Sequence, residues 1–348
     1  MKPVFHPALV NDVFGDPAVY VDFLFEKRAL LFDLGDLRNL ATRKILRLRD
    51  VFVSHAHMDH FFGFDWLLRL CLGREIRIRL FGPAGFLAQV EAKLAGYTWN
   101  LVENYDTDFT LDVIEILSEA EAYSARFRCR AGFRRENERS LVLRDGVLLD
   151  DENFTVRFGL LDHKIPCLAF ALQEKQHVNI WKNRLDELDL EPGPWLQVFK
   201  RAVLDRLPGD TLITALQRDD QGRRNVSYRL DDLAGTIAQI STGQKIAYVT
   251  DAVYHDANAE RIVQLAHGAD QFFIEAVFGD ELVERAAQKY HLTARQAGSL
   301  AHRAGVKFAV PFHFSPIYHD REDELREEFE RAFRGYPYRT WRSKRASP

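Results

Sequence analysis

The stretch that most constrains this chain is a histidine-rich loop that directly follows a short apolar run. Val51 to Val53 is typical of a buried β-strand, and Ser54 ends it. Four candidate metal ligands then follow within six positions, at His55, His57, Asp59 and His60. This spacing suits a loop at a strand end, where side chains converge on one point, because a helix would send residues two apart to different faces.

Imidazole nitrogens together with one carboxylate oxygen form the ligand set that proteins offer to zinc, or to manganese or iron of similar demand. The competing interpretation is a histidine-rich surface turn. Chance rarely places three His and one Asp at i, i+2, i+4 and i+5 directly behind a buried strand. We therefore predict a metal site at this loop.

Composition excludes several classes of protein. The chain has 348 residues, 47% of them hydrophobic and 28% charged, which is typical of a soluble globular protein of one large or two ordinary domains. The net charge of −4 provides no global positive field, so any binding to nucleic acid must rely on local patches. The three cysteines form no CxxC pair and favour free thiols. Without a secretory signal or a membrane-spanning stretch, we expect a cytoplasmic protein that does not bind membranes.

Short apolar runs alternate with segments of helical spacing along most of the chain, which predicts a layered α/β fold. Clear examples are expected strands at 245–249 and 271–274, and expected helices at 83–94 and 322–333, the first of these with Pro83 in its first turn. Thr293 and Gln296 form a capping-box pattern at the start of a helix that Gly305 ends. We interpret the chain as one domain, 1–348, with a polar, turn-rich excursion at about 174–225.

Three further positions fit the same site, because each follows an apolar strand, where open α/β sheets place their sites. They are His163, Asp251 and His313. Taken alone, each is more often a structural residue. Together with the loop they provide five imidazoles and two carboxylates, enough for two metal ions that each keep an open position for catalysis.

These residues resemble the metallo-β-lactamase fold hydrolases, and within them the ribonuclease Z family of tRNA 3′-processing endonucleases. The resemblance rests on the histidine loop, His163 with Pro166, the Val249-Thr250-Asp251 strand end, and His313. Finer matches are an Asp-x-Gly strand at Asp33, a Gly-Pro turn at Gly82, and the segments 269–276 and 291–297. The resemblance extends from about Ala29 to Phe333. It implies a four-layer αββα sandwich with two mixed sheets and with the site at the strand ends.

The resemblance also implies which residues bind each metal ion and which take part in catalysis. His55, His57 and His163 would hold one zinc ion, Asp59, His60 and His313 the other, and Asp251 would bridge them, with manganese or iron as alternative metals. The zinc-bridged hydroxide would hydrolyse RNA at the 3′ trailer of a tRNA precursor, and Asp59 would orient this hydroxide. His291 and Glu275 would deliver a proton to the leaving oxygen. A homodimer is expected.

Three departures from the family pattern keep other functions open. Ile274 and Ile317 stand where the family has His and Arg, and the excursion lacks the basic glycine-rich tip of the family's substrate arm. These departures favour a metallo-hydrolase of the same fold that acts on a small phosphodiester, a cyclic nucleotide or a (thio)ester. The further alternative is a non-catalytic binding protein on this fold.

Arginines gather in three clusters that are candidates for phosphate contacts. Because acidic residues are interspersed with the first two, a solvated charged face is the commoner explanation. The clusters are Arg126, Arg128, Arg130, Arg134 and Arg135; Arg223 and Arg224; and Arg342, Lys344 and Arg345.

Overall fold

The computed structural model describes residues 4–336, apart from 25, 176, 220–221 and 242. Its contacts divide the chain into two compact units. The first contains the described residues of Met1–Asp151, Thr155–Gln173 and Gln244–Pro348, and the second those of Glu152–Phe154 and Glu174–Gly243. No helix in this part of the chain is long and apolar enough to cross a lipid bilayer.

The first unit contains an eight-stranded sheet whose strands lie side by side in sequence order. They are β1 (Phe5–Leu9), β2 (Val19–Phe23), β3 (Ala29–Phe32), β4 (Leu48–Phe52), β5 (Arg77–Pro83), β6 (Thr110–Ile116), β7 (Glu121–Arg128) and β8 (Arg135–Val142). Strands β3 to β6 run parallel and the outer pairs antiparallel. Parallel neighbours need crossover connections. The three connections between β3 and β6 contain the helices α1 (Thr42–Ile45), α2 (Met58–Phe61), α3 (Phe64–Cys71) and α4 (Phe86–Ala95).

A second, six-stranded sheet completes the first unit, in the order β18-β17-β16-β11-β10-β9. Its strands are β9 (Val147–Asp150), β10 (Phe154–Asp162), β11 (Pro166–Glu174), β16 (Lys245–Val249), β17 (Gln271–Glu275) and β18 (Ala309–Phe312). Strands β16, β17 and β18 run parallel, while β11 is antiparallel to β16, so this sheet is also mixed. Its helices are α8 (Asp256–Ala266), α9 (Val283–Lys289), α10 (Ala294–Ala304) and α11 (Glu322–Phe333).

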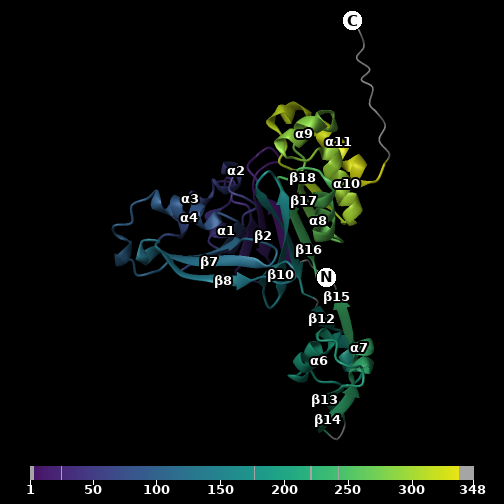
Figure 1. Ribbon diagram of the computed structural model, residues 1–348. Helices are drawn as coiled ribbons and strands as arrows, with labels where there is room; N and C mark the ends of the chain where they lie inside the picture. The colour runs from purple at the N-terminus through teal and green to yellow at the C-terminus, as the bar shows by residue number, and fades with distance from the viewer. Residues whose placement is uncertain (1–3, 25, 176, 220–221, 242, 337–348) are drawn as a thin grey trace. The chain divides into compact units, whose positions relative to one another are not determined.

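The two sheets pack face to face through fully buried aromatic rings. The ring of Phe32 lies 5.7 Å from that of Phe170 and 5.4 Å from that of Tyr248, and Phe52 lies 5.5 Å from Phe170. Helices α3 and α4 cover the outer face of the first sheet, while α8 and α10 contact the second and α11 packs on α10 (Figure 1). The predicted αββα sandwich with two mixed sheets is confirmed.

The predicted ends of a helix are correct where the residues that determine them lie in the helix or next to it. Helix α11 has the predicted bounds, and α10 begins with the predicted Thr293–Gln296 capping box and ends at Gly305, in the left-handed conformation with φ 62°. The prediction of a helix from Pro83 is wrong. Pro83 pairs with Ile116 at the end of β5, and α4 begins only after Gly85, whose φ of 91° turns the chain out of the strand.

The second unit has a hydrophobic core of its own. Two strand pairs, β12 (His177–Ile180) with β15 (Ala238–Ser241) and β13 (Leu212–Asp219) with β14 (Gly222–Arg229), accompany α5 (Lys182–Glu187), α6 (Trp195–Leu204) and α7 (Leu230–Ile237). Trp195, Phe199 and Ile237 are buried in that core. The excursion thus extends to Gly243 and is compact, whereas the description of the chain as a single domain stays a prediction.

Gly63, between α2 and α3, lies in direct backbone contact with the turn after β3. Its N–H donates to the carbonyl of Leu34 at 2.7 Å, and Leu34 N–H donates to the carbonyl of His60 at 2.9 Å. A Cβ atom on Gly63 would lie 2.2 Å from the carbonyl oxygen of Gly35. The approach of these two backbones therefore requires glycine at position 63.

We expect Gly63→Ala to lower the free energy of unfolding by about 1–3 kcal/mol, as overpacking of a close contact does. Denaturant unfolding of the metal-free protein measures this. Gly159→Ala is the matched control, because its added Cβ would meet only Leu265 Cδ2 at an ordinary 3.7 Å. Equal unfolding free energies for the two variants would contradict the steric argument.

Candidate metal centre

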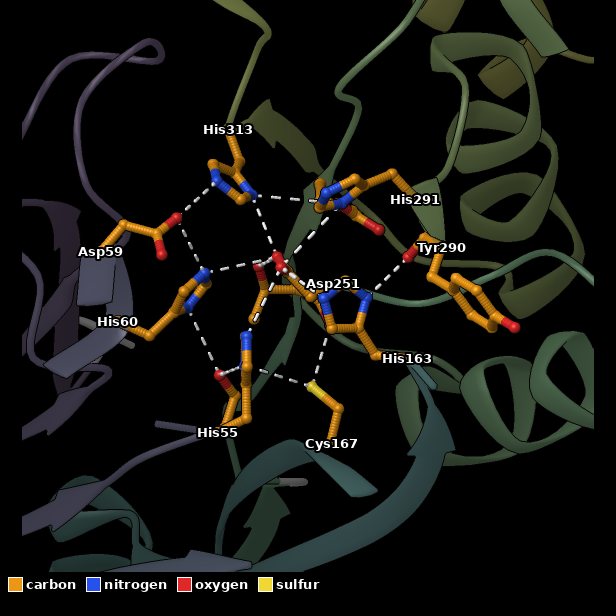
Figure 2. A network of polar contacts seen from close by, with 12 residues as sticks. His55, Asp59, His60, His163, Cys167, Asp251, Tyr290, His291 and His313 are labelled. Atoms are coloured by element: carbon orange, nitrogen blue, oxygen red, sulfur yellow. Dashed lines mark hydrogen bonds and ion pairs between the residues drawn. The ribbon is translucent and has the colours of Figure 1, made fainter. Parts of the chain in front are cut away.

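The candidate ligands lie just past the carboxyl ends of four strands drawn from both sheets. The histidine loop follows β4, and the chain then turns into α2, which carries Asp59 and His60. His163 follows β10, Asp251 comes two residues after β16, and His313 follows β18. The structure brings all seven predicted ligands together, and Figure 2 shows the labelled side chains around Asp251.

Asp251 lies at the centre and presents one carboxylate oxygen to each half of the site. Its Oδ2 is 3.6 Å from His55 Nε2 and 3.3 Å from His163 Nε2. Its Oδ1 is 3.5 Å from His60 Nε2 and 3.0 Å from His313 Nδ1. This geometry is that of a carboxylate that can bridge two ligand groups.

The ligands fall into two groups, and the ligand atoms of each lie within 4.8 Å of one another. One group is His55, His57, His163 and Asp251. In the other, Asp59 Oδ2 lies 3.4 Å from both His60 Nε2 and His313 Nε2. Each group is large enough for one ion. A third group of this kind consists of Asp251, Glu275, His291 and His313, so the division of the ligands between two ions stays a prediction.

Several ligand atoms are buried without a hydrogen bond. Among the described residues, His55 Nε2, His60 Nε2 and His313 Nδ1 have no hydrogen-bond partner, although all three face Asp251. An unsatisfied buried polar atom costs about 1–3 kcal/mol. Coordination of a metal would satisfy the Nε2 lone pairs of His55 and His60. The donor set therefore fits divalent metal ions.

Burial and neighbouring charges shift the pKa values of the imidazoles in this site. Burial and the neighbouring His60 lower the pKa of His55 to about 2, so this imidazole stays neutral and able to coordinate. Burial would lower the pKa of His313 as well, but Asp251 and Asp59 raise it to about 10. The two carboxylates thus surround the His313 ring with negative charge, which would also attract a metal cation.

The candidate proton-delivery pair lies at the rim of the same centre. His291 Nδ1 is 2.8 Å from Glu275 Oε2 and 3.9 Å from Asp251 Oδ2. Glu275, at the end of β17, is itself held by the backbone N–H groups of Ala252 and Leu292, at 2.8 and 3.1 Å. Burial opposes protonation of His291, yet Glu275 and Asp251 raise its pKa. The pair is suited to hold and orient a proton.

Sequence analysis finds Asp33 only as part of the Asp-x-Gly match and does not find Tyr248, although both help to hold the ligands from behind. His163 Nδ1 lies 2.7 Å from the backbone carbonyl of Tyr290, and Asp33 receives His60 Nδ1 at 2.9 Å. Tyr248 donates to the same Asp33 carboxylate at 2.6 Å. A polar residue at the end of a buried strand is the local signal that marks Asp33. Nothing indicates Tyr248, because a tyrosine inside an apolar strand is usually a packing residue.

Three arginines of the first cluster, Arg126, Arg128 and Arg135, form ion pairs with acidic neighbours. Arg126 pairs with Asp112 at 2.7 Å, and Arg128 pairs with Asp108 at 2.9 Å. In the second cluster Arg223 pairs with Glu191 at 2.8 Å. The third cluster lies outside the described residues. The pairs favour the interpretation as a salt-bridged surface.

Comparison with known proteins agrees with this geometry. Residues 186–314 match the family model described as beta-lactamase superfamily domain. Ribonuclease Z of Deinococcus radiodurans is 29% identical over 301 residues, which is 86% of this chain and 85% of that protein. Ribonuclease Z of Anoxybacillus flavithermus is 30% identical over 329 residues, 91% of this chain and 86% of that protein.

Two solved structures share the fold. The short form of human tRNase Z has a TM-score of 0.51 at 20% identity and covers 90% of this chain and 91% of its own. The metallo-beta-lactamase fold protein YhfI from Bacillus subtilis has a TM-score of 0.53 at 14% identity and covers 95% of both chains. From the fold, the centre and the identity over nearly its whole length, the chain belongs to the ribonuclease Z family of metallo-β-lactamase fold proteins.

Proposed function

We propose that this protein is a metal-dependent phosphodiesterase that cleaves the 3′ trailer from tRNA precursors. The observation that carries the proposal is the Asp251 carboxylate, which lies between two groups of imidazoles. In each group an inward nitrogen, His55 Nε2 or His60 Nε2, lacks a hydrogen-bond partner among the described residues. The relatives named ribonuclease Z support an RNA substrate.

Two zinc ions are the proposed metals, with manganese or iron as alternatives. His55, His57 and His163 would hold one and Asp59, His60 and His313 the other, with Asp251 shared. Divalent metals in this position supply Lewis-acid charge, which activates water and stabilises the oxygens of the phosphoryl group. Asp59, 43% exposed and 3.4 Å from both His60 and His313, would accept a hydrogen bond from the attacking water.

The leaving group needs a proton, because an alkoxide is a poor leaving group. His291 is the proposed donor and Glu275 holds its ring through Nδ1, which leaves Nε2 for the substrate. Transfer of this proton to the departing 3′-oxygen yields a 3′-hydroxyl on one product and a 5′-phosphate on the other.

Side chains of the second unit and Ile317 bear on the size of the substrate. In the second unit, the side chains of Arg218 and Arg223 on the β13–β14 hairpin are 73% and 67% exposed, and Glu191 pairs with both. Contact with an RNA phosphate would require these arginines to exchange Glu191 for the phosphate. We propose that this unit serves as the substrate arm. Ile317, 48% exposed four residues after His313, offers no such contact and favours a small phosphodiester as the second candidate substrate.

We expect His57→Ala and Asp251→Ala each to reduce cleavage more than about 100-fold, since residues behind metal ligands already cost about 10–100-fold. Single-turnover assays on a tRNA precursor with a 3′ trailer and on an aryl phosphodiester measure this. Metal analysis should find two ions per wild-type chain, and reconstitution with zinc, manganese or iron identifies the active metal. His267→Ala, at an exposed histidine, is the control and should retain full activity.

The two substrates separate the alternatives. Cleavage of the precursor at its trailer supports the tRNA-processing function. Hydrolysis of the aryl diester alone would keep the metal chemistry and move the substrate to a small molecule. If a protein with both metals cleaves neither, the phosphodiesterase proposal is wrong and a binding role on this fold remains.

The proton-delivery role predicts a dependence on the leaving group. His291→Ala and Glu275→Gln should lower the rate on RNA by about 10²–10⁴-fold, the usual contribution of general acid catalysis. The same variants should lower hydrolysis of a nitrophenyl phosphodiester less than tenfold, because that leaving group departs without a proton. Equal losses on both substrates would instead indicate damage to the metal centre.

We also propose that the chain forms a homodimer. Large apolar side chains recur at every fourth residue of α2, α3 and their junction, where Met58, Phe62 and Trp66 are 79%, 49% and 41% exposed. Exposed apolar surface of this kind is typical of interfaces. Light scattering should give twice the chain mass for the wild type and the chain mass for Trp66→Glu. A monomeric wild type would refute the proposal.

A further inference from the structure

The Asp33 carboxylate, fully buried at the end of β3, is an acceptor shared by both sheets. Its Oδ1 accepts the backbone N–H of Ser54 at 2.6 Å. Its Oδ2 accepts the Ser54 hydroxyl at 2.8 Å and lies 2.9 Å from His60 Nδ1. The fourth donor comes from β16 of the second sheet, where the Tyr248 hydroxyl reaches Oδ2 at 2.6 Å.

These hydrogen bonds set the tautomers of two ligands. Because Asp33 Oδ2 only accepts, His60 must carry its proton on Nδ1, which leaves the Nε2 lone pair facing the metal centre. The Ser54 hydroxyl donates to Asp33, so its oxygen accepts from His55 Nδ1 at 3.1 Å. One carboxylate therefore fixes an imidazole in each of the two metal groups.

The packing around the Tyr248 ring holds its hydroxyl against Asp33 Oδ2. Its ring is fully buried and stacks between Phe32 at 5.4 Å and Phe312 at 5.5 Å. Burial and the adjacent Asp33 raise the pKa of this phenol well above its usual value, so it remains a donor. Tyr248 also lies three residues before Asp251, on the strand that leads to the bridging carboxylate.

We propose that Tyr248 is a positioning residue of the metal centre, which acts through Asp33 to hold the Nε2 atoms of His55 and His60 toward their ions. Loss of its hydroxyl leaves Asp33 with three donors in a buried site, and the carboxylate can then rotate and release the imidazoles. The inference rests on the metal centre of the proposed function and is independent of the substrate.

The test is the metal affinity of Tyr248→Phe, measured by competition with a chromophoric chelator and by the visible spectrum of the cobalt-substituted protein. Removal of a residue behind metal ligands typically weakens binding about 10–100-fold, and we expect a loss of this size together with an altered cobalt spectrum. Ser54→Ala, which removes another donor to Asp33, should weaken binding in the same direction.

Tyr20→Phe is the matched control. Tyr20 is 2% exposed in β2, and its hydroxyl donates to the Lys44 carbonyl at 3.2 Å, so the variant also loses one buried hydrogen bond. We expect it to lower the melting temperature of the metal-free protein but to keep wild-type metal affinity. Wild-type affinity in Tyr248→Phe, or an equal loss in Tyr20→Phe, would overturn the proposal. Since affinity is measured without substrate, these outcomes stand whether or not RNA is cleaved.

Discussion

Buried negative charge at the junction of two sheets is the constraint on which this structure depends. Asp33, Asp251 and Glu275 are 0%, 2% and 0% exposed, and a buried carboxylate is costly unless donors or cations surround it. Backbone and side-chain donors satisfy Asp33 and Glu275. Asp251 is surrounded by imidazoles, and several of these have a ring nitrogen without a hydrogen-bond partner among the residues that the structure describes. Packing the two sheets together buries these carboxylates, and their buried negative charge favours the binding of metal cations.

The centre exists only in the assembled sandwich. Its ligands come from the ends of β4, β10, β16 and β18, which belong to different sheets and are separated by long stretches of sequence. An unfolded chain cannot present these side chains together. Metal bound to the native state consequently adds its binding free energy to the stability of the fold.

How far the sequence could predict this protein depends on the range of the interactions. The histidine loop, the strand-end ligands and the α10 capping box depend on neighbouring residues, and each leaves a pattern in the sequence. The start of α4 was misplaced because the φ of Gly85, not the proline, decides where the chain turns. The contact between Asp33 and Tyr248 joins residues 215 positions apart, and no local pattern reports it.

The second unit is attached to the core in a way that bears on how such proteins diversify. It leaves the sheet at the end of β11 and returns at the start of β16, and Gln173 and Lys245 are paired neighbours in the antiparallel ladder. A tight hairpin turn between them would close the same pair of strands. The whole segment thus behaves as an insertion in a β-hairpin, which can be lengthened, shortened or exchanged while the ladder behind it is preserved. The second unit can therefore vary in evolution while the strands that carry the metal ligands stay unchanged.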